Sequence, residues 1–172
     1  MDYTIRPVEP GDAPGIAALR RMPGVFENTL GLPSCRTADS AAFLASLGPN
    51  DHNFVAAAED GTIIAAAGLQ VCSNPRMRHV GSIGLFVHTD YQNQGVGTAL
   101  MKAILDLADN WLMLVRVELE VFADNERAIR LYEKFGFEKE GLLRMSTVRC
   151  GQYADEYKMA RLRPAVGYAV KP

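Results

Sequence analysis

The sequence predicts one α/β domain, in which helices cover both faces of a mixed β-sheet. Two observations carry this prediction. Before residue 88, three strand-like stretches follow one another with no room for a crossover helix, which indicates an antiparallel meander. After residue 88, apolar residues recur at helical and strand periods in turn, as in right-handed crossover units. The predicted element order is therefore β-α-α-β-β-β-α-β-α-β-β.

The first half of the chain predicts a strand, two helices and the meander. Asp12 and Thr37 can begin the two helices, because their side chains can accept hydrogen bonds from the first free backbone amides. Glu59-Asp60-Gly61 has the composition of a hairpin turn. The predicted elements are a strand over residues 3–7, helices over 13–22 and 38–47, and strands over 53–58, 62–72 and 80–87.

The second half predicts helices that alternate with strands. A period of 3.6 over residues 96–111 places Trp111 on the apolar face of a helix. Asn125 can cap the next helix and Gly136 can end it. The last strand is expected at an edge of the sheet, where pairing with a second copy would cover it. The predicted elements are helices over 96–111 and 126–135, and strands over 115–121, 137–142 and 153–162, with a loop around Gly151.

Length, charge and cysteine content exclude several classes of protein. The 172 residues suit one domain that needs no metal or disulfide to complete its core. Because 18 Lys and Arg nearly balance 20 Asp and Glu, a nucleic-acid partner is not expected. The longest apolar stretch, residues 63–69, is too short to span a membrane, and the first residues do not resemble a signal peptide. The three cysteines and three histidines lack metal-ligand spacing, so we expect no metal, free thiols and a cytoplasmic location.

The most informative stretch is Gln92-Asn93-Gln94-Gly95-Val96-Gly97-Thr98, which lies directly between a predicted strand and a predicted helix. Its glycines let the backbone turn tightly, so that several N–H groups converge where the helix begins. Such a turn suits a pyrophosphate, although a glycine-rich turn without a ligand has the same pattern. A dinucleotide-binding fold is disfavoured, because Leu100 occupies the third glycine position and the turn follows an antiparallel meander.

Two motifs together resemble the GCN5-related N-acetyltransferase (GNAT) family. The first is Gln92-x-x-Gly95-x-Gly97, and the second is Asn125-x-x-Ala128-x-x-Leu131-Tyr132-x-Lys134-x-Gly136-Phe137. The resemblance covers nearly the whole chain and implies the family's fold, with an N-acetyltransferase domain over residues 1–163 and a short tail over 164–172. Residues 109–112, 118–125 and 151–155 further resemble a bacterial subgroup, the YhhY-like amino-acid N-acetyltransferases.

The resemblance implies acetyl-CoA as the donor, bound in a V-shaped opening between two parallel central strands. It places the pantetheine arm against the strand backbone at residues 85–87 and the pyrophosphate at the glycine-rich turn. It also places Asn125 near the pantetheine and the acceptor, and Tyr132 near the thioester sulfur. The implied donor-binding residues are Leu85, Phe86, Val87, Gln92, Asn93, Gln94, Gly95, Val96, Gly97, Thr98 and Asn125.

Moving an acetyl group from a thioester to an amine requires orientation, a donor for the oxyanion and two proton transfers. A backbone N–H at residues 85–87 could supply the oxyanion donor. Tyr132 is the candidate acid for the thiolate, and the alternative is a tyrosine that only fills the core. Glu120 is the candidate base, and the alternatives are a solvated carboxylate that shares a strand face with Glu118, or a chain of waters.

The expected acceptor is a small primary amine, such as a free amino acid, contacted by the first two helices and the loops at 24–33 and around Gly151. Two alternatives stay open: an N-terminal or ribosomal-protein acetyltransferase, and a non-catalytic acyl-CoA-binding sensor. Tyr132 favours an enzyme over a sensor. The side chains that could contact the acceptor, or simply face water, are Glu27, Arg76, Arg78 and Asp155.

Overall fold

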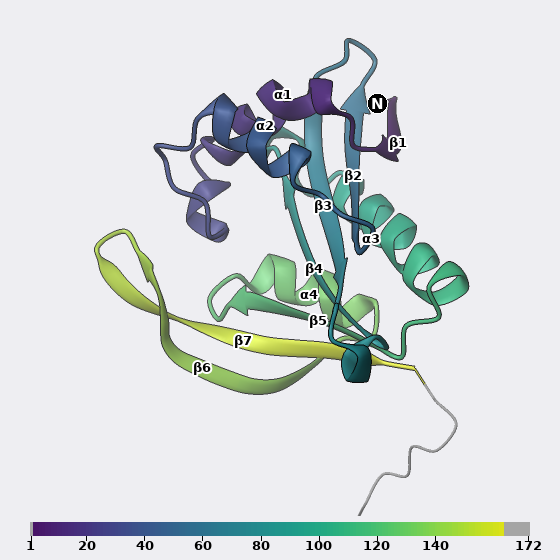
Figure 1. Cartoon of the computed structure of the whole chain (residues 1–172). Helices are drawn as coiled ribbons and strands as arrows, with labels where there is room; N and C mark the ends of the chain where they lie inside the picture. Colours follow the sequence, from purple (N-terminus) through teal and green to yellow (C-terminus); the bar gives the residue numbers. More distant parts are fainter. Residues whose placement is uncertain (1, 164–172) are drawn as a thin grey trace, which may run out of the picture.

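Seven strands and four α-helices make up residues 2–163, the part of the chain that the computed structural model describes (Figure 1). Their order confirms the predicted succession of elements. The strands are β1 (Tyr3–Pro7), β2 (Asp51–Ala58), β3 (Ile63–Val71), β4 (Val80–Val87), β5 (Arg116–Phe122), β6 (Glu138–Arg149) and β7 (Gln152–Leu162). The helices are α1 (Ala13–Arg20), α2 (Thr37–Ala45), α3 (Val96–Asp106) and α4 (Glu126–Lys134). The expected tail, 164–172, lies outside the described residues.

The strands form one mixed sheet in the order β1-β2-β3-β4-β5-β7-β6. The pair β4–β5 is parallel, and the other neighbouring pairs are antiparallel. α1 and α2 lie over one face of the meander, and α3 lies over the other (Figure 1). Among the described residues, no helix is both long and apolar enough to cross a membrane.

The side chains of β3 fill two cores, one on each face of the sheet, and a shift in the β2–β3 register at Ile64 interrupts their strict alternation. Ile63 and Ala66 pack with Ile16 and Leu19 of α1, whereas Ile64 belongs to the core under α3. α1 approaches the sheet closely because it carries Gly15, where an added Cβ would lie 2.6 Å from an Ile63 side-chain carbon. A strand with both faces buried explains why the longest apolar stretch of the chain falls here.

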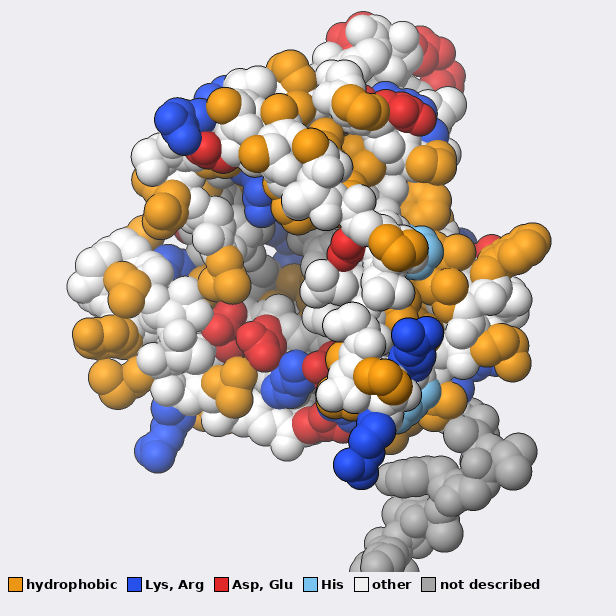
Figure 2. All heavy atoms as spheres, in the orientation of Figure 1, with side chains coloured by type: hydrophobic (Ala, Val, Ile, Leu, Met, Phe, Trp, Pro, Cys, Tyr) orange, Lys and Arg blue, Asp and Glu red, His pale blue; other side chains and the backbone are white. Residues whose placement is uncertain are grey.

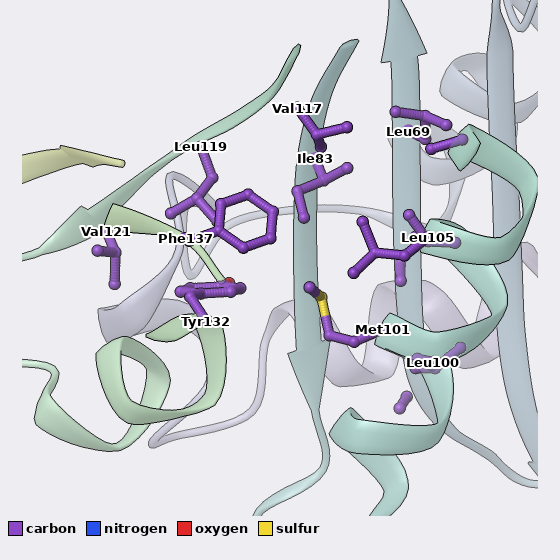
Figure 3. Close-up of a cluster of buried hydrophobic side chains, with 14 of the residues drawn as sticks. Leu69, Ile83, Leu100, Met101, Leu105, Val117, Leu119, Val121, Tyr132 and Phe137 are labelled. Carbon is purple, nitrogen blue, oxygen red and sulfur yellow. The ribbon is translucent and has the colours of Figure 1, made fainter. Parts of the chain in front are cut away.

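The larger core joins α3, the centre of the sheet and α4 (Figure 3). Leu100 and Met101 of α3 are fully buried, and they face the side of the sheet that also packs against α4. Phe137, directly after α4, is 2% exposed and anchors the helix end to β5. This core fixes α3 and α4 relative to the central strands, from which the site is built.

The two central strands pair for only three residues and then separate. β4 and β5 are in register at Val80–Arg116, Gly81–Val117 and Ser82–Glu118, and no pair follows. Beyond that point β4 continues to pair with β3, and β5 continues to pair with β7. The divergence produces the V-shaped opening that the sequence resemblance implies.

The expectation that residues 153–162 form an edge strand is wrong. β7 inserts between β5 and β6, and pairs with Arg116–Phe122 along its length, so the edge belongs to β6. β6 also runs seven residues past the predicted end at Leu142. The pairing register shifts between Leu143 and Thr147, and Met145 has a φ of +53°, so this irregularity hides the strand from an alternation pattern.

Two predicted helix starts differ from the structure. The Asp12 carboxylate does not cap α1, because it accepts two hydrogen bonds of 2.8 Å from Arg6 and one from the Glu9 amide. Thr37 is the first residue of α2 rather than its cap, and Arg36 occupies the cap position. By contrast, Asn125 caps α4 as predicted.

Trp111 is not on the buried face of its helix, as the 3.6-residue period predicts, but 76% exposed. The chain leaves the α-helical path after Asp106 and forms a π-helical turn over Leu107–Trp111. In that turn the Leu112 amide donates to the Leu107 carbonyl, five residues back. Because a π turn holds more residues than an α turn, it rotates Trp111 away from the core.

Candidate active site

Two cavities meet inside the opening between β4 and β5. The loop cavity, about 340 Å³, lies between β4, the glycine-rich turn and α4. The sheet cavity, about 660 Å³, lies between the α1–α2 region, the sheet and β7. Figure 2 shows the hollow on this face, between the α1–α2 region above and the β6–β7 hairpin below. The residues that line both cavities are Asn28, Thr29, Leu85, Phe86, Asn125, Ala128 and Tyr132.

The glycine-rich turn leads from β4 into α3 with its backbone turned toward the loop cavity. Gly95 caps α3 with a φ of +88°, and an added Cβ there would meet no atom within 4 Å. Asn93 also has a positive φ, +60°. Two glutamine side chains hold the turn: Gln92 Nε2 donates to the Val87 carbonyl (2.9 Å), and Gln94 Nε2 donates to the Asp90 carbonyl (2.6 Å). Gly95, Gly97 and Thr98 line the loop cavity, so the start of α3 borders open space. The first backbone amides of a helix have no partner within it, and a helix start of this kind suits an anion.

The structure brings nine of the eleven predicted donor-binding residues to the wall of the loop cavity, and two lie elsewhere. Gln94 folds back onto the turn, and Val96 is 1% exposed in the core under α3. The nine lining residues are Leu85, Phe86, Val87, Gln92, Asn93, Gly95, Gly97, Thr98 and Asn125.

α4 supplies three cations to the loop cavity that the sequence analysis missed. Arg127, Arg130 and Lys134 line it, and none of the described residues that line it is acidic. Arg127 donates to Gln92 Oε1, which joins α4 to the glycine-rich turn. The signal was present in the sequence, because a spacing of three and then four residues places all three on one helix face. Their charge suits phosphate groups.

Tyr132 lies where the two cavities meet. Its ring packs 5.9 Å from that of Phe137, centroid to centroid, and 6% of the residue is exposed (Figure 3). The hydroxyl has no hydrogen-bond partner among residues 2–163. Every fully buried side-chain N or O atom in this part of the chain does have a partner, so the unpartnered Oη is not fully buried. It therefore borders the cavity space. Burial raises the pKa of Tyr132 to about 12, so the phenol keeps its proton at neutral pH.

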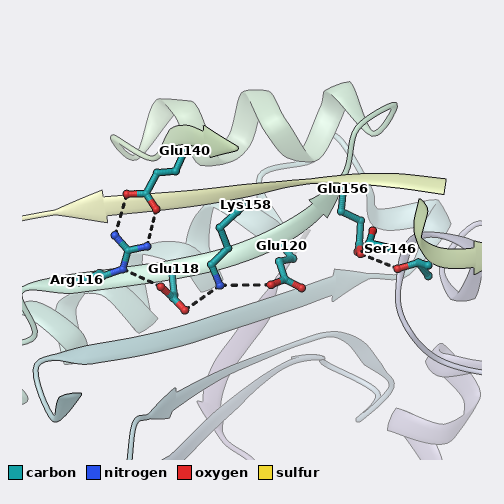
Figure 4. A network of polar contacts seen from close by, with 8 residues as sticks. Arg116, Glu118, Glu120, Glu140, Ser146, Glu156 and Lys158 are labelled. Carbon is teal, nitrogen blue, oxygen red and sulfur yellow. Dashed lines mark hydrogen bonds and ion pairs between the residues drawn. The ribbon is translucent and has the colours of Figure 1, made fainter. Parts of the chain in front are cut away.

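Glu120 and Glu118 share one face of β5, where a row of alternating charges crosses the sheet (Figure 4). Arg116 binds Glu140 and Glu118, and Lys158 of β7 lies 2.8 Å from Glu118 and 3.4 Å from Glu120. Burial acts to raise the pKa of Glu118, but hydrogen bonds from Lys158 and Arg116 outweigh it and lower that pKa. Glu118 is therefore held as an ion, whereas Glu120 is 47% exposed, lines the sheet cavity and has the weaker contact with Lys158.

The sheet cavity contains a buried carboxylate that the sequence analysis missed. Glu156 of β7 is 6% exposed, and its Oε2 accepts from Ser146 Oγ (2.8 Å) and Thr147 Oγ1 (2.6 Å) (Figure 4). Its register partner on β5 is Phe122, at the wide end of the opening. No sequence signal distinguishes it, because a glutamate in an expected edge strand is normally solvated.

Several side chains considered for the acceptor have other roles. Glu27 accepts from the Gly24 amide (2.6 Å), and Asp155 accepts from the Met145 amide (2.8 Å). Arg76 and Arg78 are exposed and line neither cavity. The α1–α2 region does contribute, and the loop at 24–33 lines both cavities. A cation that was not considered, Arg20, lines the sheet cavity beside the ring of Phe43.

Comparison with known proteins identifies the family. The sequence profile of the Acetyltransferase (GNAT) family matches residues 25–137, which contain the glycine-rich turn, the opening and α4. The chain belongs to the GNAT family. It is therefore an acetyl-CoA-dependent N-acetyltransferase, and the resemblance inferred from its two motifs is confirmed.

Individual proteins are similar to this chain over more than nine tenths of its length. L-amino acid N-acetyltransferase AaaT of Escherichia coli K12 is 33% identical over 94% of this chain and 99% of its own length. An acetyltransferase of the GNAT family from Streptococcus pneumoniae has a TM-score of 0.78 at 26% identity, covering 94% of this chain and 99% of its own. Spermidine N-acetyltransferase of Vibrio cholerae, solved with CoA and spermine, has a TM-score of 0.82 at 22% identity, covering 93% of this chain and 95% of its own.

The polar groups at the GNAT site do not form a metal centre in the described part of the chain. No group of three or more His, Cys, Asp or Glu side chains between residues 2 and 163 is placed to hold an ion. Cys35, Cys72 and Cys150 are unpaired thiols.

Proposed function

We propose that the loop cavity binds acetyl-CoA and the sheet cavity binds the amine, so that the thioester lies beside Tyr132. The observation that carries this proposal is that the two cavities share part of their lining, including Tyr132. The amides of the glycine-rich turn hold the pyrophosphate. Arg127 and Lys134 of α4 neutralise the phosphate charge, together with Arg130, which also forms a solvent-exposed ion pair with Glu126 (3.0 Å). Beyond Ser82, the edge of β4 that faces β5 has no strand partner, so its backbone groups on that side are free to bind the pantetheine arm.

The transfer is direct. The amine nitrogen forms a bond to the thioester carbonyl carbon, the oxyanion is stabilised by a backbone N–H at residues 85–87, and the carbon–sulfur bond then breaks. Tyr132 donates its proton to the departing thiolate, which its raised pKa permits across the neutral range. Glu120 takes the proton of the acceptor ammonium, directly or through water.

The acceptor that suits the sheet cavity best is a free amino acid. The cavity carries Glu120 and Glu156 for an ammonium group, and Arg20 for a carboxylate. Arg20 forms no ion pair with any described residue, so its guanidinium can bind a substrate carboxylate. The similarity to an enzyme named L-amino acid N-acetyltransferase supports the same class.

We further propose that residues 1–163 form the N-acetyltransferase domain. We also propose that the protein works in a reducing compartment such as the cytoplasm, and that it forms a homodimer. The unpaired thiols suit a reducing compartment. The surface for self-association is β6 rather than β7, because β6 is the sheet edge and exposes Leu142, Met145 and Val148. Light scattering tests the dimer.

Calorimetric titration with acetyl-CoA tests the donor site. The wild-type chain should bind in the micromolar range typical of substrates, and Gly95→Trp should weaken binding at least about 100-fold by filling the space above the turn. Gly61→Trp is the matched control, since Gly61 also has a positive φ (+84°) and open space around it but lies in the β2–β3 turn. Equal loss in both variants, or no binding by the wild-type chain, would contradict the proposal.

Release of CoA in the presence of candidate amines tests the acceptor. L-amino acids should be acetylated, and Arg20→Ala should raise their KM about tenfold without affecting amines that lack a carboxylate. Acetylation of peptide N-termini or ribosomal proteins alone would indicate a protein acceptor. Tight acetyl-CoA binding with no acceptor among these would indicate a non-catalytic sensor.

A further inference from the structure

The three carboxylates of the sheet cavity differ in what already occupies their oxygens. Both oxygens of Asp51 have donors: the Gly48 amide (2.8 Å) binds one, and the Gln70 side chain (3.0 Å) binds the other. Glu120 faces Lys158 and is about half exposed. Glu156 is the most buried of the three, at 6% exposure, and has no cation within ion-pairing distance among residues 2–163.

Both hydrogen bonds to Glu156 reach the same oxygen. The hydroxyls of Ser146 and Thr147 donate to Oε2, and no described donor reaches Oε1. Since no described side-chain oxygen is both fully buried and unpartnered, Oε1 borders open space, and the space that Glu156 lines is the sheet cavity. One oxygen is therefore fixed by β6, and the other is presented to the cavity.

A carboxylate this buried is costly unless a positive charge or further donors compensate it. The arrangement favours a cation with a single N–H directed at one oxygen. A guanidinium would use both oxygens side by side, and Oε2 is already saturated by two hydroxyls. A metal ion would need several ligands, and no described group of three His, Cys, Asp or Glu side chains is placed to provide them. An ammonium group fits the one free oxygen.

We propose that Glu156 receives the ammonium group of the acceptor and thereby selects amines that enter the sheet cavity positively charged. The inference rests on the proposed function and specifies its acceptor side. Phe122, the register partner of Glu156, and Phe86 line the same cavity and supply apolar surface for the carbon chain that carries the ammonium. Glu156 then holds the amine on β7, across the opening from the β4 strand that holds the donor.

The test uses the full chain saturated with CoA and follows backbone amide NMR signals of residues 154–158 during titration with n-propylamine, which is an ammonium ion at pH 7. The neutral 1-propanol is titrated in parallel. The wild-type chain should bind the ammonium ion at least about tenfold more tightly than the alcohol. Glu156→Gln, which keeps the volume and an oxygen for the two hydroxyls, should abolish that preference.

Asp51→Asn is the matched control, because Asp51 is a carboxylate of the same cavity but both of its oxygens already have donors. This variant should still bind propylammonium more tightly than 1-propanol. The inference is overturned if Glu156→Gln binds propylammonium as tightly as the wild-type chain does, or if Asp51→Asn loses as much affinity for propylammonium as Glu156→Gln. It is also overturned if the wild-type signals respond equally to the amine and the alcohol. The wild-type comparison needs no variant, so misfolding of Glu156→Gln would leave the test intact.

Kinetics separate this inference from the proposed function. Glu156→Gln should raise the KM of the acceptor about tenfold or more and leave the Kd of acetyl-CoA unchanged. If the wild-type chain acetylates amines while the variant has an unchanged acceptor KM, the role of Glu156 fails and the proposed function stands. If the wild-type chain binds propylammonium through Glu156 but transfers no acetyl group to any amine, the proposed function fails and the cation site stands.

Discussion

The two cavities of the opening are adjacent but opposite in charge. Three cations and no carboxylate of the described chain line the loop cavity, whereas Asp51, Glu120 and Glu156 outnumber Arg20 and Lys158 in the sheet cavity. Although the formal net charge of the chain is only −2, cations gather in one cavity and carboxylates predominate in the adjacent one. This difference favours separate binding of the two substrates of the proposed reaction, the anionic donor in one cavity and the cationic acceptor in the other, with Tyr132 among the residues that both cavities share.

The largest effect is expected where the cavities join. Tyr132→Phe removes the proton donor but keeps the ring against Phe137, so kcat should fall about 100-fold while the acetyl-CoA KM stays within about threefold. Tyr157→Phe, a tyrosine that lines neither cavity, is the control. A kcat for Tyr132→Phe within twofold of wild type would mean that Tyr132 only fills the core and does not donate a proton to the thiolate.

The next effect concerns the positive side of the comparison. Arg127→Gln removes a loop-cavity cation that also contacts Gln92, and should raise the acetyl-CoA KM about tenfold. The KM of the wild-type enzyme should increase with salt more steeply than that of the variant. Lys102→Gln, an exposed cation on α3 outside both cavities, should change neither. If Arg127→Gln and Lys102→Gln have the same acetyl-CoA KM and the same salt dependence, the positive charge of the loop cavity has no part in donor binding.

A smaller effect, a decrease rather than an increase in KM, is expected from removing a cation in the sheet cavity. Lys158→Gln removes the cation between Glu118 and Glu120 and leaves this side more acidic. The KM of a cationic acceptor should fall about threefold, equivalent to roughly 0.6 kcal/mol, with the acetyl-CoA KM unchanged. Steady-state kinetics at low salt would show it. A rise in the acceptor KM would instead mean that Lys158 contacts the substrate itself.

The smallest effect is a pH profile that stays flat. An acid with the ordinary tyrosine pKa of about 10 would lose roughly three quarters of its protonated form by pH 10.5. Burial raises the pKa of Tyr132 to about 12, so the protonated form, and with it kcat, should change less than about twofold between pH 9 and 10.5. A steep decline over that interval, with the fold intact by circular dichroism, would contradict the assigned environment of the phenol.

The loop cavity could be predicted from the sequence because its parts are local. The turn at residues 92–98 and the cap at Asn125 each lie within a few residues of the helix that they begin. Gly95 has a positive φ, a backbone conformation that glycine adopts readily. Even the three cations that were missed follow one helical face of α4.

The sheet cavity could not be predicted, because long-range pairing creates it. Glu156 reaches the opening only because β7 inserts between β5 and β6, an order that no local pattern specifies. Its hydroxyl partners, Ser146 and Thr147, reach it only because β6 continues past the irregularity at Met145. A bulge and a strand order are decided by tertiary packing, so the residues that they bring together have no common signature in the chain.

The short parallel pairing of β4 with β5 also has a thermodynamic consequence. Only three register pairs join these two strands, so a ligand that binds both walls of the opening would act as an additional link across the sheet. A ligand that binds only the native state at about 100 times its Kd adds roughly 2.7 kcal/mol to the free energy of unfolding. For a domain of this size, acetyl-CoA should therefore raise the melting temperature by about 5–10 °C.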